Sequence, residues 1–211
     1  SRERLDFTFT GSLGGLIALG NGEADIAGSH LWDEESGTYN IPFAQRLLPG
    51  ERVAVLTLAH RRLGLIVPPG NPAGITHVAD LARPGLRLIN RQRGAGSRVW
   101  LEAALRGAGI QAAQLAGYDV EMLTETAVAH AIAGGNADTG PGIEAAARVY
   151  SLDFVFLAKE RYDLIVPARS WERPAVQALA GWLASDEAKS AIMALGGYDI
   201  SETGQVVWYE F

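Results

Sequence analysis

The segment from Leu86 to Leu105 constrains the fold most, because it predicts a short strand that turns through glycines into a helix. An apolar run, Leu86 to Ile89, precedes the segment Asn90-Arg91-Gln92-Arg93-Gly94-Ala95-Gly96-Ser97-Arg98, and a helical pattern follows from Val99 to Leu105. The first amides of such a helix have no partner within the helix and lie at the positive end of its dipole. The segment therefore has the outline of an anion-binding site.

The residue types of this turn fit that chemistry. Gly94 and Gly96 allow the backbone to approach a ligand closely, Ser97 offers a hydroxyl, and Arg98 brings a guanidinium that is always charged. The plainer alternative is an ordinary capped helix with basic residues on a solvated turn. The turn is not a dinucleotide fingerprint, because Val99 stands where a third glycine is needed, and no Walker lysine follows.

Composition narrows the classes of partner. The 211 residues carry a formal charge of -6, which argues against a nucleic-acid surface, so any anion must be bound locally. The chain has no cysteine, which excludes disulfides, thiolate metal sites and cysteine nucleophiles. No run of 18 apolar residues exists, and Ser1-Arg2-Glu3-Arg4 does not resemble a signal peptide. We expect no membrane contact.

The first part of the chain predicts a βαβ unit followed by two strands. Leu5 to Thr10 alternates as a strand, Leu13 to Leu19 is helical with Ser12 at its start, and Ala24 to Gly28 is a buried strand, which implies parallel pairing. Val53 to Ala59 and Leu63 to Val67 are predicted as two strands, separated by His60-Arg61-Arg62 on the surface.

Short α/β units continue from Ile75 towards the C-terminus. Strands are predicted at 154–157 and 162–167, helices at 124–133, 143–149, 173–183 and 185–195, and a tail at 203–211. Alternating strands and helices predict an α/β fold in which each lobe is an open, mainly parallel sheet flanked by helices. Two segments cross between the lobes. We expect lobe 1 to comprise residues 1–62 plus 166–211, and lobe 2 residues 63–165.

Many short motifs together resemble the bacterial periplasmic-binding-protein superfamily. The similarity is specifically to the type II, PBP-like cytoplasmic domains attached to molybdenum-cofactor biosynthesis proteins or to helix-turn-helix regulators of molybdate uptake. The matching motifs are Gly11-Ser12-Leu13-Gly14-Gly15-Leu16, Gly22-Glu23-Ala24-Asp25-Ile26-Ala27-Gly28-Ser29-His30-Leu31, Tyr39-Asn40-Ile41-Pro42, Leu48-Pro49-Gly50, Gly64-Leu65-Ile66-Val67, Gly70-Asn71-Pro72, Asn90-Arg91-Gln92, Gly96-Ser97-Arg98 and Ala137-Asp138-Thr139-Gly140.

The resemblance implies a hinged fold that closes on an oxyanion such as molybdate or tungstate and signals to a fused or partner domain. That domain is a helix-turn-helix or a molybdopterin-biosynthesis domain, so this chain itself contacts no nucleic acid. A cytoplasmic location and the lack of a cofactor or metal follow from the same resemblance. Relatives begin with a further strand and helix before Leu5. The ligand-binding residues that the resemblance implies are Ser12, Arg91, Ser97, Arg98, Thr126 and Thr139.

Two other functions stay open on the sequence. One is an enzyme acting on a phosphorylated or pterin-like ligand, although no Gly-x-Ser-x-Gly elbow or zinc spacing is present. The other is an interaction module that binds no small ligand and associates through Trp171, Trp182 or Trp208. The kind of anion is open too. Loops rich in donors favour proton-free dianions, whereas Asp138 and Glu125 near these loops favour a cationic or protonated ligand.

Overall fold

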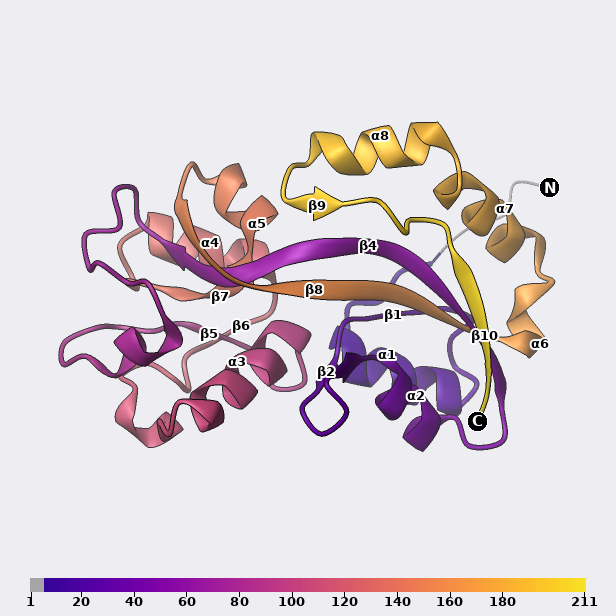
Figure 1. Cartoon of the computed structure of the whole chain (residues 1–211), viewed down its shortest axis with the longest axis horizontal. Helices are drawn as coiled ribbons and strands as arrows, with labels where there is room; N and C mark the ends of the chain where they lie inside the picture. The colour runs from indigo at the N-terminus through magenta and orange to yellow at the C-terminus, as the bar shows by residue number, and fades with distance from the viewer. Residues whose placement is uncertain (1–5) are drawn as a thin grey trace. The chain divides into compact units, whose positions relative to one another are not determined.

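The computed structural model describes residues 6–211. The chain divides into two compact units, Ser1–His60 with Arg161–Phe211, and Arg61–Glu160. The boundaries between the units, 60/61 and 160/161, fall within two long strands, β4 (Arg52–Val67) and β8 (Asp153–Pro167). These strands are neighbours in one sheet (Figure 1). The sequence analysis predicted these boundaries at 62/63 and 165/166.

The first unit, Ser1–His60 with Arg161–Phe211, is a sheet covered by helices. Its strands follow the order β1-β8-β4-β10, and β9 also pairs with β4. Besides its parts of β4 and β8, its elements are α1 (Gly11–Gly20), β1 (Ala27–Ser29), β2 (Trp32–Asp33), β3 (Thr38–Tyr39), α2 (Ile41–Leu47), α6 (Ala168–Trp171), α7 (Pro174–Leu183), α8 (Asp186–Ala194), β9 (Tyr198–Asp199) and β10 (Val206–Glu210).

Three helices of this unit, α1, α7 and α8, were predicted from the sequence, whereas α2 and the strand pairing were not. The helix predicted at Leu13 to Leu19 is α1, and Ser185 caps α8 by accepting a hydrogen bond from the amide of Ala188 at 3.2 Å. The predicted parallel βαβ unit is wrong, because β1 pairs antiparallel with β8, with Ala27 opposite Ile165. The pairing partner comes from a distant part of the chain, which local periodicity does not reveal.

Two more predictions in this unit are corrected. The described residues of the strand predicted at 5–10, residues 6–10, form no strand. Phe7 and Phe9 are 80% and 93% exposed there, so this alternating pattern has no surface to pack against. The tail predicted from Thr203 to Phe211 contains β10, which pairs antiparallel with β4, with Val206 opposite Leu56.

The second unit, Arg61–Glu160, mixes parallel and antiparallel pairing. Strand β5 pairs with β6 in parallel, and Leu88 forms a parallel bridge with Thr139, whereas β7 pairs antiparallel with β4. The elements that lie wholly in this unit are η1 (Val78–Ala82), β5 (Asn90–Arg91), α3 (Gly96–Gly107), η2 (Ala112–Gln114), β6 (Glu121–Met122), α4 (Glu125–Ala133), β7 (Gly140–Ile143) and α5 (Glu144–Val149).

The two predicted strands on either side of His60-Arg61-Arg62 are one continuous strand, β4, and the two predicted at 154–157 and 162–167 are likewise one, β8. Arg61 was expected on the surface, but it is buried. Its Nε donates to Glu160 on β8 at 2.8 Å, and Glu160 is fully buried. Because each charge neutralises the other, this pair can stay buried where β4 passes through the charged stretch. Arg62 is exposed, as expected.

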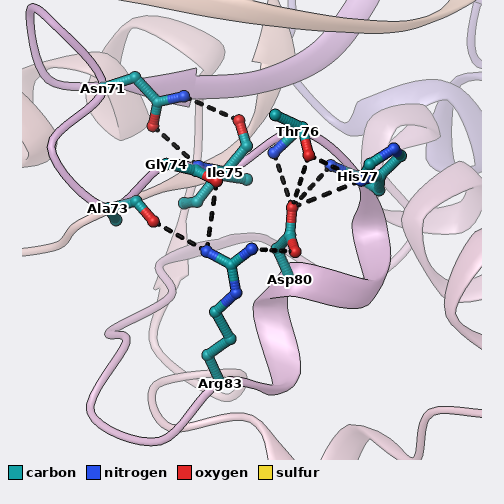
Figure 2. A network of polar contacts seen from close by, with 8 residues as sticks. All are labelled: Asn71, Ala73, Gly74, Ile75, Thr76, His77, Asp80 and Arg83. Atoms are coloured by element: carbon teal, nitrogen blue, oxygen red, sulfur yellow. Dashed lines mark hydrogen bonds and ion pairs between the residues drawn. The ribbon is translucent and has the colours of Figure 1, made fainter.

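A polar loop between β4 and η1 anchors the second unit (Figure 2). The carboxylate of Asp80 accepts from the backbone amide of Thr76 at 2.7 Å and from its hydroxyl at 3.0 Å, and Arg83 pairs with the same carboxylate. The pKa of Asp80 lies well below its usual range, chiefly because of the bond from the Thr76 amide. Ile75 is held next to this cluster by both polar atoms of the Asn71 side chain.

An apolar cluster lies under these elements and fixes the start of the glycine turn. Leu88 and Leu101 flank the turn in sequence, and both are buried in this cluster. Its buried members are Leu65, Val67, Ile75, Leu81, Leu86, Leu88, Leu101, Leu105 and Leu115. The backbone on either side of the predicted anion site is therefore anchored in the core of its own unit.

Candidate functional site

The glycine turn predicted from the sequence is present and leads into α3. The amide of Gln92 donates to the carbonyl of Met122 at 3.0 Å, and the amide of Ala95 donates back to Gln92 at 3.1 Å. Gly94 has φ of 82°, a left-handed conformation that favours glycine. Within residues 6–211, no side chain caps α3, whose N-cap residue is Ala95. The first amides of α3 are therefore left for a ligand.

A second helix, α4, begins beside the first. Its N-cap is Thr124, whose hydroxyl accepts from the amide of Ala127 at 3.0 Å. The helix predicted at 124–133 is thus confirmed. Thr126, one of the predicted ligand-binding residues, lies within its first turn, exposed, with its hydroxyl 3.1 Å from that of Thr124. Both α3 and α4 contact β5, which precedes α3 in the chain, and β7, which follows α4 (Figure 1).

Three side chains join the starts of these helices, and we call them the Arg91 site: Arg91, Ser97 and Glu125. Glu125 opens α4, and its Oε1 accepts from Arg91 Nη1 at 3.1 Å and from the Ser97 hydroxyl at 2.9 Å. Ser97 is fully buried, and the Arg91 side chain is 9% exposed. The sequence-predicted residues Arg91 and Ser97 are thus brought together, through a carboxylate.

The Arg91 site is incompletely hydrogen-bonded. Arg91 Nε and Glu125 Oε2 are both buried from solvent, and neither has a hydrogen-bond partner among the described residues. A buried polar atom without a partner costs free energy, so each of these two atoms is a candidate contact for a ligand or a water. The site therefore offers one unused donor and one unused acceptor.

Gly142 in β7 makes room for the Glu125 carboxylate. A Cβ at this position would lie 3.0 Å from Glu125 Oε2 and 2.6 Å from the Cδ1 of Ile66. Any larger residue would therefore displace the carboxylate or the strand side chain behind it. The absence of a side chain at Gly142 is what allows Oε2 to lie there.

Arg98 has different surroundings, which we call the Arg98 clamp: Arg98, Glu102, Tyr118 and Glu121. The Arg98 side chain is 2% exposed. Its Nε donates to Glu102 at 2.9 Å, its Nη1 donates to Glu121 at 2.5 Å, and the guanidinium lies 5.0 Å from the ring centroid of Tyr118. Nη1 also donates to the backbone carbonyl of Arg91 at 3.0 Å. Arg98 thus holds the backbone of the neighbouring site.

The electrostatics of the Arg98 clamp favour its charged pairing. Burial acts to lower the pKa of Arg98, but hydrogen bonds to Glu102 and Glu121 outweigh it, so the pKa of Arg98 is raised. Burial raises the pKa of Tyr118, and the hydrogen bond from its hydroxyl to Glu102, at 2.8 Å, raises it further. These contacts all involve protein groups, and the role of Arg98 as a ligand contact stays a prediction.

The remaining predicted residues have other hydrogen-bond partners. The Thr139 hydroxyl is buried and donates to the carbonyl of Ile66 at 3.0 Å. Ser12 belongs to the other compact unit, where it is buried in α1 and its hydroxyl accepts from the amide of His30 at 3.3 Å. Ligand roles for Ser12, Thr126 and Thr139 stay predictions.

Asp138 is separately engaged. Its Oδ1 accepts from Arg87 Nη2 at 2.8 Å, and its Oδ2 accepts from the Arg87 amide at 2.8 Å. The side-chain bond from Arg87 lowers the pKa of Asp138. Of the two acidic residues that the sequence placed near the loops, Asp138 is paired on both oxygens, and Glu125 keeps one oxygen unused.

Sequence reasoning missed the carboxylates that hold Arg98. Glu102 lies four residues after Arg98 on the same helix face, a spacing that could have indicated the pair. Glu121 reaches it from β6, through a parallel pairing in which Asn90 lies opposite Glu121. No local sequence pattern indicates this pairing, because β5 and β6 are far apart in the chain.

Among residues 6–211, no group of three or more His, Cys, Asp or Glu side chains is arranged to hold a metal ion. No helix in that range is long and apolar enough to cross a membrane.

The fold and the Arg91 site together fit an α/β ligand-binding domain, and the comparison with protein families is specific. Residues 1–184 match the family model described as a PBP superfamily domain, so the chain belongs to this family. The protein YvgK of Bacillus subtilis is 36% identical over 199 residues, which cover 94% of this chain. The chain spans 64% of the length of that relative.

Solved structures show the same fold. A putative phosphate ABC transporter substrate-binding protein with bound phosphate from Clostridium perfringens superposes with a TM-score of 0.64 at 13% identity, covering 89% of this chain and 84% of that one. The tungstate ABC transporter from Geobacter sulfurreducens gives 0.58 at 16% identity, covering 84% and 80%. The prediction of a two-lobed α/β fold of periplasmic-binding-protein type is confirmed.

Proposed function

We propose that this chain is a binding and sensing domain that takes a small oxyanion at the Arg91 site. One observation carries the proposal. The starts of two helices, α3 and α4, are joined at a buried guanidinium that keeps an unused donor, Arg91 Nε. Helix N-termini and an arginine in a water-poor environment are the donors that bind oxyanions most effectively.

The comparisons support this class of ligand. Of the two solved structures of the same fold, one is described as a phosphate transporter substrate-binding protein with bound phosphate and the other as a tungstate transporter. The sequence resemblance favours molybdate or tungstate as the anion, and a fused or partner domain in the cytoplasm as the receiver of the signal. A ligand signals by binding one conformation more tightly than another, which shifts the population between them.

The test is thermal unfolding of the full chain with an excess of phosphate, sulfate, molybdate or tungstate. A ligand at about 100 times its dissociation constant stabilises the folded state by about 2.7 kcal/mol, which raises the unfolding midpoint measurably. We expect at least one anion to raise the midpoint, and Arg91→Ala to abolish the rise.

Arg87→Ala is the matched control. Arg87 is an arginine of the same unit, its side chain is 53% exposed, and it pairs with Asp138 outside the Arg91 site. This variant should keep the full response to the anion. A response unchanged in Arg91→Ala would place the anion elsewhere, and no response to any of the four anions would overturn the proposal.

A further inference from the structure

We propose that the first unit holds a second binding site, which takes a small organic cation with an apolar body. The site is a cavity of about 590 Å³, which we call the β10 cavity. Residues of β3, α2, β4, β8, β10 and the turn before β10 line it. All of them belong to the unit Ser1–His60 with Arg161–Phe211, whereas the Arg91 site belongs to the other unit. Small-molecule sites are usually cavities of about 300 to 1,000 Å³.

Part of the lining of the β10 cavity is apolar. Val55 of β4 and Val207 of β10 lie opposite each other in the sheet, and Ile41 of α2 lines the cavity with them. Val55 is buried, whereas Val207 is 44% exposed and Ile41 is half-buried. An apolar side chain that is left partly exposed gains stabilisation when a ligand covers it. The cavity therefore favours a ligand with an apolar body over a small inorganic ion.

Two tyrosines suit the β10 cavity to a cation. Tyr39 and Tyr209 both line it. Each ring packs against another aromatic ring, with 5.0 Å between the centroids of Tyr39 and Trp32 and 5.9 Å between those of Tyr209 and Phe211. The face of an aromatic ring carries the negative part of its quadrupole and attracts ammonium groups. The tyrosine rings therefore favour a cation over an anion of similar size.

The Arg161 guanidinium, which also lines the cavity, is already bound by protein acceptors. Its Nε donates to both oxygens of Asp163 at 3.0 Å. Its Nη1 donates to Glu202 at 2.9 Å, and its Nη2 donates to the Thr57 hydroxyl at 2.6 Å. Asp163 is 1% exposed and also accepts from the Asn40 side chain, at 2.8 Å. An anionic ligand would have to compete with these acceptors for Arg161.

Glu202 supplies the acceptor that a cation needs. Its Oε2 accepts from Arg161 Nη1 at 2.9 Å and lies 3.9 Å from Nε2 of His60, whereas its Oε1 has no hydrogen bond or ion pair with a described residue. The Glu202 side chain is 40% exposed, so a ligand can reach it. Together with Asp163, it gives the lining two carboxylates against one guanidinium. The unused polar atom and the surplus charge both favour a cation.

The experiment is calorimetric titration of the full chain with three ligands that share one body and differ in charge. Phenethylamine is a cation at neutral pH, phenethyl alcohol is neutral, and phenylacetate is an anion. We expect phenethylamine to bind at least about tenfold more tightly than the other two, because only a cation gains from both the tyrosine rings and the Glu202 carboxylate. Arg91→Ala should bind phenethylamine as the wild-type chain does, since Arg91 lies in the other unit.

Two variants and a matched control assign the contacts. Glu202→Gln keeps the size of the side chain and removes its charge, so the preference for phenethylamine over phenethyl alcohol should fall about fivefold. Tyr209→Leu keeps an apolar side chain and removes the ring, which should lower the same preference about threefold. Glu172→Gln removes an equal charge at an exposed residue of the same unit, outside the lining, and should leave the preference unchanged.

A dissociation constant for phenethylamine above about 10 mM would overturn the site. Equal or tighter binding of phenethyl alcohol or phenylacetate would overturn the cationic ligand class. A preference unchanged in both Glu202→Gln and Tyr209→Leu would place the amine outside the β10 cavity, and so would a loss of binding in Arg91→Ala. The wild-type titrations decide the ligand class even if a variant, checked by thermal unfolding, does not fold. None of these results changes the proposal for the Arg91 site, which the anions test separately.

Discussion

Two arginines seven residues apart, Arg91 and Arg98, are both buried and lie in one loop-helix segment, yet they have opposite surroundings. The guanidinium of Arg98 is bound by Glu102, Glu121 and a backbone carbonyl, and it faces a tyrosine ring. The guanidinium of Arg91 bonds Glu125 and keeps its Nε unused. The guanidinium of Arg98 is thus held by protein groups, whereas the Arg91 site keeps buried polar atoms without a partner among the described residues.

This difference indicates different roles for Arg91 and Arg98, although both are arginines of the same short segment. When the donors of a buried charge are taken by protein groups, removing that charge leaves its partners uncompensated and destabilises the fold. A buried group with an unused donor is destabilising until a ligand supplies the missing partner, which is a property of binding sites. The carbonyl of Arg91 connects the two, since Arg98 donates to it.

The largest expected effect is on stability, in Arg98→Ala. The change removes a guanidinium that is 2% exposed and leaves two carboxylates without their partner. We expect the free energy of unfolding to fall by about 3 kcal/mol, measured by urea denaturation. Arg93→Ala, at a side chain 79% exposed in the same turn, should cost under about 1 kcal/mol. A stable Arg98→Ala that fails to bind the anion that stabilises the wild-type chain would instead make Arg98 a ligand contact.

A smaller effect, on binding, is expected in Ser97→Ala. The Ser97 hydroxyl donates to Glu125 Oε1, and without it the carboxylate is less firmly held beside the ligand. We expect the affinity for the anion that the wild-type chain binds to fall about fivefold to tenfold, which corresponds to about 1 to 1.4 kcal/mol. Calorimetric titration measures the change. Ser36→Ala, at an exposed serine of the other unit, is the control and should leave the affinity unchanged.

Tyr118→Phe deletes a hydroxyl in the Arg98 clamp and should have the reverse pattern. The lost bond to Glu102 should lower the free energy of unfolding by about 1 kcal/mol. Anion affinity should stay within about twofold of the wild type, because the ring and Arg98 remain. If Tyr118→Phe weakened anion binding as much as Ser97→Ala, the separation between the clamp and the site would fail.

The smallest effect is a pH dependence of the same clamp. The pKa of Tyr118 is raised in the folded state, by burial first and by Glu102 second, so the folded chain holds this proton more tightly than the unfolded chain. The resulting stabilisation is complete below the ordinary tyrosine pKa of about 10 and is lost as the pH rises through the folded-state value. Urea denaturation between about pH 8 and pH 11 should show a smaller alkaline loss in Tyr118→Phe than in the wild-type chain. Identical losses would contradict this.

The glycine turn and most of the helices could be predicted from local sequence, because their signals are local. Gly94, the helical pattern after Gly96, and Ser185 before two acidic residues each act within one turn of backbone. Strand pairing was not readable in the same way. The partners of β1 and β10 lie far away in the chain. Strand β4 continues through His60-Arg61-Arg62, which was predicted to separate two strands, and Arg61 pairs there with the buried Glu160.

The sequence by itself determined the fold family and the anion-binding outline of the Leu86 to Leu105 segment, with Arg91 and Ser97 as candidate ligand residues. Only the tertiary structure decided which guanidinium is held by several protein groups and which keeps an unused donor. That decision depends on Glu121 and Glu125, which reach the two guanidinium groups from β6 and α4. Since a guanidinium binds whichever acceptors the fold brings to it, its role follows from long-range packing rather than from its position in a motif.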